Sequence, residues 1–222
     1  MKLQYLGDSK DRFKWDYHDY LTSSLGYDSF NILPMLTPDD KTTEGSTKPD
    51  WFPAREGTIN FCNSISSNRK ITNIKDLPKH TGSNYSINLH NSSTDIKTNR
   101  SNYYSDIPDF NNQVVFIDPD NGFEPEKSCS EKHVKYSEIP DILNQISDNS
   151  CISVFHHFRR ITFTDDFNRI KESILSVTPS SFVSAIYWHQ LMFVQITQSE
   201  KTSVKISNLC NEYSASYPVN VI

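Results

Sequence analysis

The chain has 222 residues, of which 22 are Lys or Arg and 27 are Asp or Glu, and its formal net charge is −5. This length suits one α/β domain and is enough to bury a sizeable core. The mildly acidic balance excludes a molecule whose whole surface attracts nucleic acid, so any such binding needs a local basic patch.

The cysteines and the N-terminal stretch indicate the cellular compartment. The four cysteines are far apart and form no CxxC or Cys/His motif, so we expect reduced thiols rather than a zinc site or a disulfide framework. The stretch MKLQYLGDSKDRFKWDYHDYL is charged and has no apolar signal core, and no run of about 18 apolar residues occurs in the chain. We therefore expect a cytoplasmic protein without a membrane segment.

The first 37 residues predict a helix followed by a strand. Apolar residues recur at the spacing of one helix face at Phe13, Tyr17, Tyr20, Leu21 and Leu25. Asp8 or Ser9 is suited to cap the start of this helix, and Gly26 is suited to end it. The stretch FNILPML at 30–36 predicts a buried strand, in which Pro34 favours a strand end or a sheet edge.

The next region, at about 38–106, differs in composition. It is rich in Ser, Thr, Asn and Asp and poor in aliphatic residues, as in TPDDKTTEGSTKPD, so we expect a polar, loop-rich insertion. Only FPAREGTINFCNSI and KITNIKDLP predict short regular elements within it.

From residue 111 onward, strands and helices alternate. QVVFIDPD at 113–120 is a continuous apolar run that ends in acids, which is typical of a central parallel strand. A roughly helical pattern follows, in which Pro140 is suited to start a second helix after a turn. CISVFHHF at 151–158 predicts another buried strand.

The last part of the chain predicts a helix and a strand hairpin. Helical spacing is seen at Phe167, Ile170, Ile174 and Leu175. Thr164 is suited to cap this helix, and Asp165 and Asp166 suit its first turn. The stretch FVSAIYWHQLMFVQIT predicts an antiparallel hairpin that turns at His189 and Gln190.

This order predicts one α/β domain over residues 1–222. We expect a Rossmann-like open, mainly parallel sheet with helices on both faces and a C-terminal antiparallel hairpin. In such sheets ligands bind outside the carboxyl ends of the strands. The segments DPDNG at 118–122 and HHFRR at 156–160 both follow predicted strands, so we expect them on the same rim of the sheet.

The acids of DPDNG have two interpretations. Asp118 and Asp120, with Glu124 nearby, are suitable oxygen ligands for a divalent cation such as Mg²⁺ or Mn²⁺. Alternatively, the segment is an Asx-type turn in which Gly122 adopts a positive φ.

The basic segment that follows the next strand also has two interpretations. His156 and His157 are suited to proton transfer near neutral pH, and Arg159 is suited to binding a phosphate. Strand alternation places His156 and Phe158 on one side and His157 and Arg159 on the other, if the strand extends that far. Alternatively, the segment is a solvated strand end with an ion pair to Asp165 or Asp166.

The start of the first helix carries a charged group as well. Asp8, Asp11 and Lys14 lie within about a turn of one another, at a helix N-terminus whose free amides can bind an anion. A plain helix cap with exposed salt bridges is the alternative.

The order VVFIDPDNG, helix, CISVFHHF, helix, AIYWHQLMFVQI resembles the C-terminal half of the class I (Rossmann-like) methyltransferase fold. In amino-group nucleic-acid methyltransferases, an Asp/Asn-Pro-Pro-Tyr-like motif ends the fourth strand and binds the target amine. Asp118 and Pro119 match its first two positions, and Asp120 and Asn121 occupy the other two.

The N-terminal segment adds to this resemblance. It is similar to the helix start of small adenine methyltransferases with a Gly-Asn-x-x-Asp-x-x-Lys-His pattern, matched by Gly7, Asp8, Asp11 and Lys14. The resemblance implies S-adenosylmethionine as cofactor, held in part by these four residues, and a nucleic-acid substrate. No Gly-x-Gly turn follows FNILPML, where the fold normally binds this cofactor.

The chain also resembles an uncharacterised prokaryotic family with the motifs GDSxDxxKWD, PMLT and DPDNGxEP. This second resemblance implies no function.

Three functions therefore remain open. One is a methyltransferase-like enzyme that acts on nucleic acid, in which Asp118 and Asn121 orient an amine. The second is a metal-dependent phosphodiesterase or nuclease, in which Asp118 and Asp120 bind the metal, His156 or His157 transfers a proton and Arg159 binds the phosphate. The third is a non-catalytic binding or regulatory protein. The order of the elements favours the first.

Overall fold

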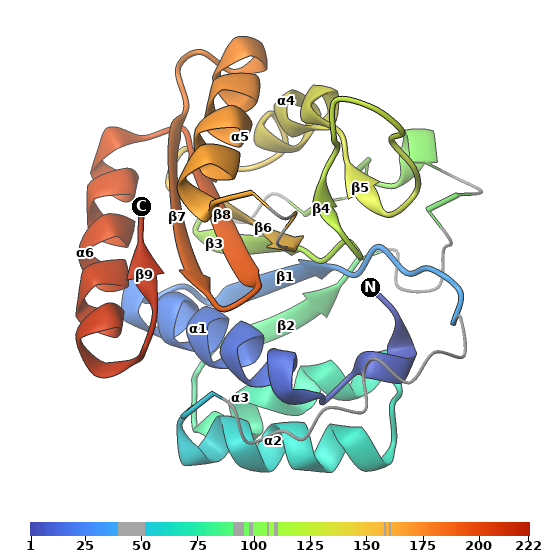
Figure 1. Ribbon diagram of the computed structural model, residues 1–222. Helices are drawn as coiled ribbons and strands as arrows, with labels where there is room; N and C mark the ends of the chain where they lie inside the picture. The colour runs from blue at the N-terminus through green and yellow to red at the C-terminus, as the bar shows by residue number, and fades with distance from the viewer. Residues whose placement is uncertain are drawn as a thin grey trace.

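The computed structural model describes residues 1–39, 52–90, 96–97, 100–105, 107–108, 111–157, 159 and 161–222. In this part of the chain, a seven-stranded sheet has the strand order β2-β1-β3-β6-β8-β7-β9 (Figure 1). Its strands are β1 (Ser29–Leu33), β2 (Ser86–Leu89), β3 (Gln113–Ile117), β6 (Cys151–His157), β7 (Phe182–Trp188), β8 (Leu191–Thr197) and β9 (Asn220–Val221). Two short strands, β4 (Gly122–Phe123) and β5 (His133–Val134), pair separately.

The pairing directions confirm the predicted Rossmann-like α/β fold. β1 pairs in parallel with β2 and β3, and β3 pairs in parallel with β6. β8 then runs antiparallel between β6 and β7, which forms the predicted C-terminal hairpin. Because β3 and β6 are parallel neighbours, the segments that follow them emerge at the same edge of the sheet.

Helices cover both faces of the sheet, as predicted (Figure 1). The α-helices are α1 (Ser9–Leu25), α2 (Glu56–Ser67), α3 (Leu77–Thr81), α4 (Ile139–Leu143), α5 (Phe163–Val177) and α6 (Glu200–Ser216). Among the described residues there are also four short 3-10 helices: η1 (Leu3–Tyr5), η2 (Ile71–Asp76), η3 (Arg100–Asn102) and η4 (Tyr136–Glu138). None of the described helices is long and apolar enough to cross a membrane.

The sheet separates two hydrophobic cores of different character. On the face covered by α1, α2, α3 and α6 the core is aromatic: Phe13 lies 4.9 Å from Phe193, and Tyr17 stacks on the same ring at 5.7 Å between centroids. On the face covered by α4 and α5 it is mainly aliphatic, with residues such as Ile117 and Ile170. Aromatic packing on both α1 and β8 therefore fixes the position of α1 over the sheet.

Local sequence signals account for the ends of the first elements. Asp8 caps α1, as predicted, by accepting hydrogen bonds from the backbone N–H groups of Lys10 and Asp11, and Gly26 ends the helix in the left-handed conformation. β1 ends at Leu33, directly before Pro34, in agreement with the predicted strand end. β1 is an interior strand, between β2 and β3.

One predicted cap is wrong. Thr162, and not Thr164, caps α5: its hydroxyl accepts a hydrogen bond from Asp165 N, and the helix begins at Phe163. Thr164 lies inside the first turn, where its side chain cannot reach a free amide of that turn in the way an N-cap residue does.

The polar stretch at 38–106 contains more regular structure than its composition indicates. α2, η2 and α3 correspond to the two predicted short elements, whereas β2 forms in a part that was expected to be loop. Residues 40–51, 91–95, 98–99 and 106 of this stretch lie outside the described residues.

Candidate functional site

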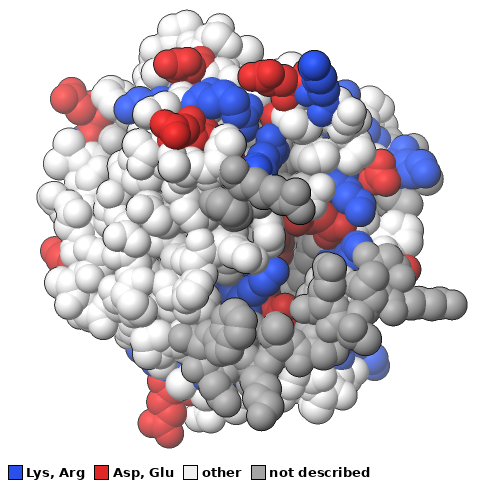
Figure 2. All heavy atoms as spheres, viewed as in Figure 1, with Lys and Arg blue, Asp and Glu red and all other residues white. Residues whose placement is uncertain are grey.

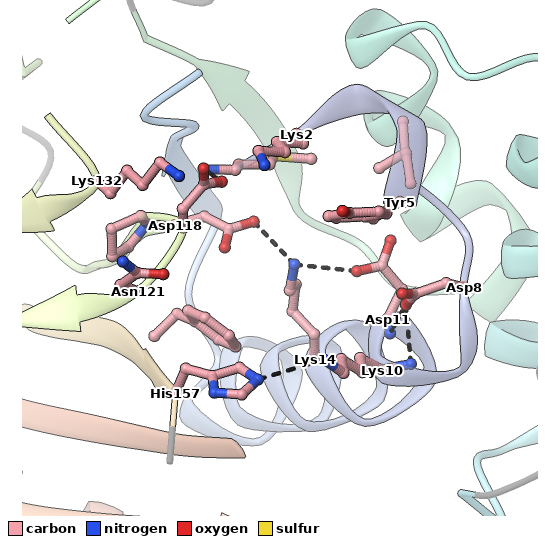
Figure 3. Close-up of a pocket in the computed structure, with 15 residues that line it drawn as sticks. Lys2, Tyr5, Asp8, Lys10, Asp11, Lys14, Asp118, Asn121, Lys132 and His157 are labelled. Carbon is pink, nitrogen blue, oxygen red and sulfur yellow. Dashed lines mark hydrogen bonds and ion pairs between the residues drawn. The ribbon is translucent and has the colours of Figure 1, made fainter. Parts of the chain in front are cut away.

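A cavity of about 310 Å³ lies at the carboxyl edge of the sheet, between the ends of β3 and β6 and the first turn of α1 (Figure 3). On the face of the molecule that Figure 2 shows, acidic and basic side chains lie together around a hollow. The polar lining residues are Lys2, Asp8, Lys10, Asp11, Lys14, Asp118, Asp120, Asn121, Lys132 and His157. The cavity thus brings together residues from the start of α1, from DPDNG and from HHFRR.

The two strand-end segments are joined directly. The backbone N–H of His157 donates to Asn121 O at 3.1 Å, and Asp118 N donates to Leu33 O at 3.0 Å at the end of β1. The prediction that DPDNG and HHFRR share one rim is therefore confirmed.

Lys14 lies at the centre of the charged lining (Figure 3). Its Nζ is 2.9 Å from Asp118 Oδ2 and 3.0 Å from Asp11 Oδ1, and all three side chains are less than 10 % exposed. Burial alone lowers the pKa of Lys14, but the carboxylates of Asp11 and Asp118 outweigh it and raise this pKa above its ordinary value. Burial raises the pKa of Asp118, and the ammonium of Lys14 opposes that rise. Lys14 is thus a permanent buried cation held between two acids.

The first turn of α1 holds the acids in place. Asp11 Oδ2 accepts a hydrogen bond from Gly7 N at 2.7 Å. Gly7 has a φ of +82°, and a Cβ there would lie 2.7 Å from Cys62 O, so no other residue fits this contact with α2 without movement. Burial, together with the charge of Asp11, raises the pKa of Asp8 to about 7. Of the four residues that the resemblance assigned to the cofactor, Asp8, Asp11 and Lys14 line the cavity, and Gly7 supports Asp11 from behind.

Asp120 and Asn121, which follow Asp118 in the sequence, line the cavity on the side opposite α1. The Asp120 carboxylate lies 2.6 Å from the amino group of Met1 and accepts a hydrogen bond from Thr37 Oγ1. Burial alone raises the pKa of Asp120, but the amino group and Thr37 outweigh it and lower this pKa. The Asn121 amide contacts the imidazole of His133, which no sequence signal indicated.

Strand alternation separates the two histidines of β6, as predicted. His157 lines the cavity, with Nε2 3.3 Å from Lys10 Nζ. His156 is fully buried on the opposite side, where Nε2 lies 2.7 Å from Asp166 Oδ2 and Nδ1 accepts from Phe123 N. Because a backbone N–H can only donate, Nδ1 carries no proton and His156 is neutral; burial lowers its pKa accordingly.

Gly122 makes the contact with His156 possible. It has a φ of +108°, as the Asx-turn interpretation expects, and a Cβ on it would lie 2.2 Å from His156 Nδ1. Asp166 also accepts from Arg169 Nη2 at 2.7 Å. For His156, the structure agrees with the predicted alternative in the partner, Asp166, but the contact is a hydrogen bond from a neutral, buried imidazole and not an ion pair at a solvated strand end.

Arg159 does not line the cavity either. The strand ends at His157, so alternation does not extend to Arg159. Burial lowers the pKa of Arg159, and the charge of Asp166 opposes this. Phe158, its partner in the predicted alternation, lies outside the described residues. Catalytic roles for His156 and Arg159 stay predictions.

The predicted metal ligands do not form a group. Asp118 is paired with Lys14, Asp120 with Met1 and Thr37, and Glu124 accepts from Tyr136 N at 2.8 Å outside the cavity. In the part of the chain that the structure describes, no three His, Cys, Asp or Glu side chains are placed to bind a metal ion together.

Several lining residues were not predicted from the sequence. Lys10 lies one helical turn before Lys14, a spacing that places both on one helix face and could have indicated it. Lys132 precedes a strand of only two residues, and Phe155 alternates with apolar neighbours, so neither had a distinguishing signal.

Comparisons with protein-family models, with curated proteins and with solved structures found no match to this chain. The geometry and chemistry of the cavity are therefore what bears on function.

Proposed function

We propose that the chain is a methyltransferase-like enzyme that binds S-adenosylmethionine in this cavity and transfers its methyl group to an amino group of a nucleic acid. One observation carries the proposal: the ion pair between Lys14 and Asp118, 104 residues apart, joins the α1 segment to the strand-end segment around one cavity. These are the two segments whose motifs are similar to those of amino-group methyltransferases.

The charges of the cavity support a ligand that carries both signs. The amino-acid end of S-adenosylmethionine has an ammonium and a carboxylate, and its sulfur is positively charged. Asp8 and Asp11 are suited to the cationic groups, and the partly exposed Lys10 and Lys132 are suited to the carboxylate or to a phosphate of the substrate. Tyr5 and Phe155 provide apolar surface for a planar ring.

The second oxygen of Asp118 points into the cavity, beside Asn121 (Figure 3). A carboxylate there accepts a hydrogen bond from an amine and orients its lone pair. The methyl carbon leaves the sulfonium sulfur, which keeps the electron pair and becomes a neutral thioether, and bonds to the amine nitrogen. The nitrogen then loses a proton to water.

The metal-dependent phosphodiesterase has no comparable support. Its three ligand candidates are separately paired, and two of its other residues, His156 and Arg159, lie outside the cavity lining.

A thermal-shift titration tests the proposal. A ligand that binds only the folded state at about 100 times its Kd stabilises that state by about 2.7 kcal/mol. We expect S-adenosylmethionine to raise the unfolding midpoint of the wild type and of a control, Asp165→Asn, whose side chain is exposed on α5. The increase should be smaller in Lys10→Met and in Asp118→Asn.

Two outcomes of this titration would contradict the proposal. If S-adenosylmethionine leaves the midpoint unchanged while Mg²⁺ or Mn²⁺ raises it, the hydrolase replaces the methyltransferase. If none of the three changes the midpoint, the enzyme proposal fails and a binding or regulatory role is favoured.

A further inference from the structure

The contact between Asn121 and His133 determines which end of the Asn121 amide faces the cavity. His133 lies next to Lys132 in β5, and its side chain is largely buried behind the cavity wall. Asn121 Nδ2 lies 3.4 Å from His133 Nε2.

The other imidazole nitrogen fixes the proton of His133. Nδ1 receives the backbone N–H of Ser130 at 3.2 Å, and an N–H can only donate, so Nδ1 is an acceptor without a proton. Ser130 Oγ lies 3.1 Å from the same nitrogen. This hydroxyl accepts from Lys132 N at 3.4 Å and therefore has its own proton available for Nδ1.

An imidazole with a bare Nδ1 carries its proton on Nε2. Burial, followed by the charge of Arg159, lowers the pKa of His133, which agrees with a neutral ring of this tautomer. Nε2–H is then a donor, and it faces a second donor, the amide nitrogen of Asn121. A half-turn of the amide about its Cβ–Cγ bond replaces this repulsion with an N–H···O bond and hardly changes the shape of the side chain.

We propose that His133 is a positioning residue that binds Asn121 Oδ1 and thereby presents Asn121 Nδ2 to the cavity as a hydrogen-bond donor. The ligand consequently offers an acceptor at this point, such as a carbonyl oxygen or an unprotonated ring nitrogen. Since Asp118 beside it accepts, this end of the cavity recognises a ligand edge that has one donor and one acceptor.

This deepens the proposed function and rests on it for the identity of the ligand. The orientation of the amide, however, can be measured in the protein without any ligand, so the two proposals can fail separately.

Two substitutions of His133 distinguish the possible arrangements. His133→Gln keeps one donor and one acceptor and can bind Asn121 Oδ1 as the imidazole does. His133→Glu offers only acceptors, so it should attract Nδ2 and turn Oδ1 to the cavity. Both side chains are similar in length, which makes the pair a matched control for packing.

Nitrogen-15 NMR of the full chain provides the readout. We expect the His133 signals, assigned by their loss in His133→Gln, to show a protonated Nε2 and a bare Nδ1 at pH 8. The Asn121 side-chain N–H protons should exchange with water rapidly in the wild type and in His133→Gln, and more slowly in His133→Glu. A proton on Nδ1, or equal exchange in all three proteins, would overturn the proposal, whatever S-adenosylmethionine does in the thermal-shift titration.

Discussion

Two buried ion clusters lie at the same edge of the sheet, on its opposite faces. The lysine cluster (Asp11, Lys14 and Asp118) lines the cavity, and the histidine cluster (His156, Asp166 and Arg169) lies on the other side of β6. In the histidine cluster, protein groups occupy both imidazole nitrogens, and Gly122 closes over the ring. The lysine cluster adjoins open space and an acid, Asp8, that titrates near neutral pH.

The difference shows that a buried ionisable group with a shifted pKa does not always lie beside space for a ligand. Both clusters hold a carboxylate against a cation, yet only one has room for a ligand beside it. We therefore expect substitutions in the histidine cluster to affect stability alone, and substitutions around the lysine cluster to affect ligand binding as well.

The largest effect on stability is expected at Gly122, which packs against the imidazole of the histidine cluster. In Gly122→Ala, backbone strain at φ +108° and the overlap with His156 should together cost about 5 kcal/mol. Urea unfolding measures this loss. Gly82→Ala is the matched control, because Gly82 also has a positive φ, +74°, but has no atom near its added Cβ. The control should lose only about 1 kcal/mol, and equal losses would show that the contact with His156 is unimportant.

Removing the central cation of the lysine cluster is next in size. Lys14→Met leaves the buried carboxylates of Asp11 and Asp118 without the cation that they share, which should cost about 3 kcal/mol at pH 7. The loss should shrink at pH 4, because burial raises the pKa of Asp118 and this carboxylate can then take up a proton. Chemical unfolding at the two pH values tests this, and a loss that is independent of pH would contradict the buried-charge explanation.

A pair of histidine substitutions compares the two faces directly. His156→Gln should destabilise the fold by about 2 kcal/mol through lost hydrogen bonds and leave the shift caused by S-adenosylmethionine unchanged. His157→Gln should change the stability by less than about 1 kcal/mol and reduce that shift, since His157 lines the cavity. Thermal-shift titration of both variants is the measurement. The same response from both would remove the distinction between the two faces.

The smallest effect concerns Asp8. Its pKa in the folded state is about 7, above the ordinary value of 3.8, so the folded state binds the proton more tightly than the unfolded state does. Stability from this group is complete below about pH 4 and is lost as the pH rises to about 7. We expect a change on the order of 1 kcal/mol, because the cap hydrogen bonds and the charge of Lys14 favour the ionised form of Asp8. Asp8→Asn keeps the cap and should flatten the stability profile in this window; an unchanged profile would exclude Asp8 as its source.

Local patterns in the sequence were sufficient for much of the fold. The apolar run at β3, the spacing of apolar residues in α1 and the turn at His189 and Gln190 each act over a few residues, and the structure confirms all three. The parallel order then placed DPDNG and HHFRR on one rim without further information.

Other elements lacked such a local signal. β2 has only four residues, with polar Ser86 and Asn88, and takes its strand form from its pairing with β1. α6 is rich in Ser and Asn, and few of its residues face the core, among them Ile206, Cys210 and Tyr213. Tertiary contacts outweigh the weak local preferences in both.

The candidate site was predictable in part for a similar reason. The alternation of side chains along β6 predicted that His156 and His157 lie on opposite faces of the sheet, but it could not predict which face adjoins the cavity. The bond between Lys14 and Asp118 depends on how α1 lies on the sheet, which is set by its aromatic packing against β8. No spacing within either segment encodes that contact.

The packing of α1 also has a consequence for synthesis on the ribosome. Phe13 contacts Phe193, and Asp16 accepts a hydrogen bond from Tyr213 at 2.8 Å, so α1 binds elements that are synthesised long after it. At about 5–20 residues per second, α1 waits for about 10–40 s before these partners emerge. During that interval the aromatic face of α1 has no core to pack against, and the cavity that α1 helps to form is incomplete.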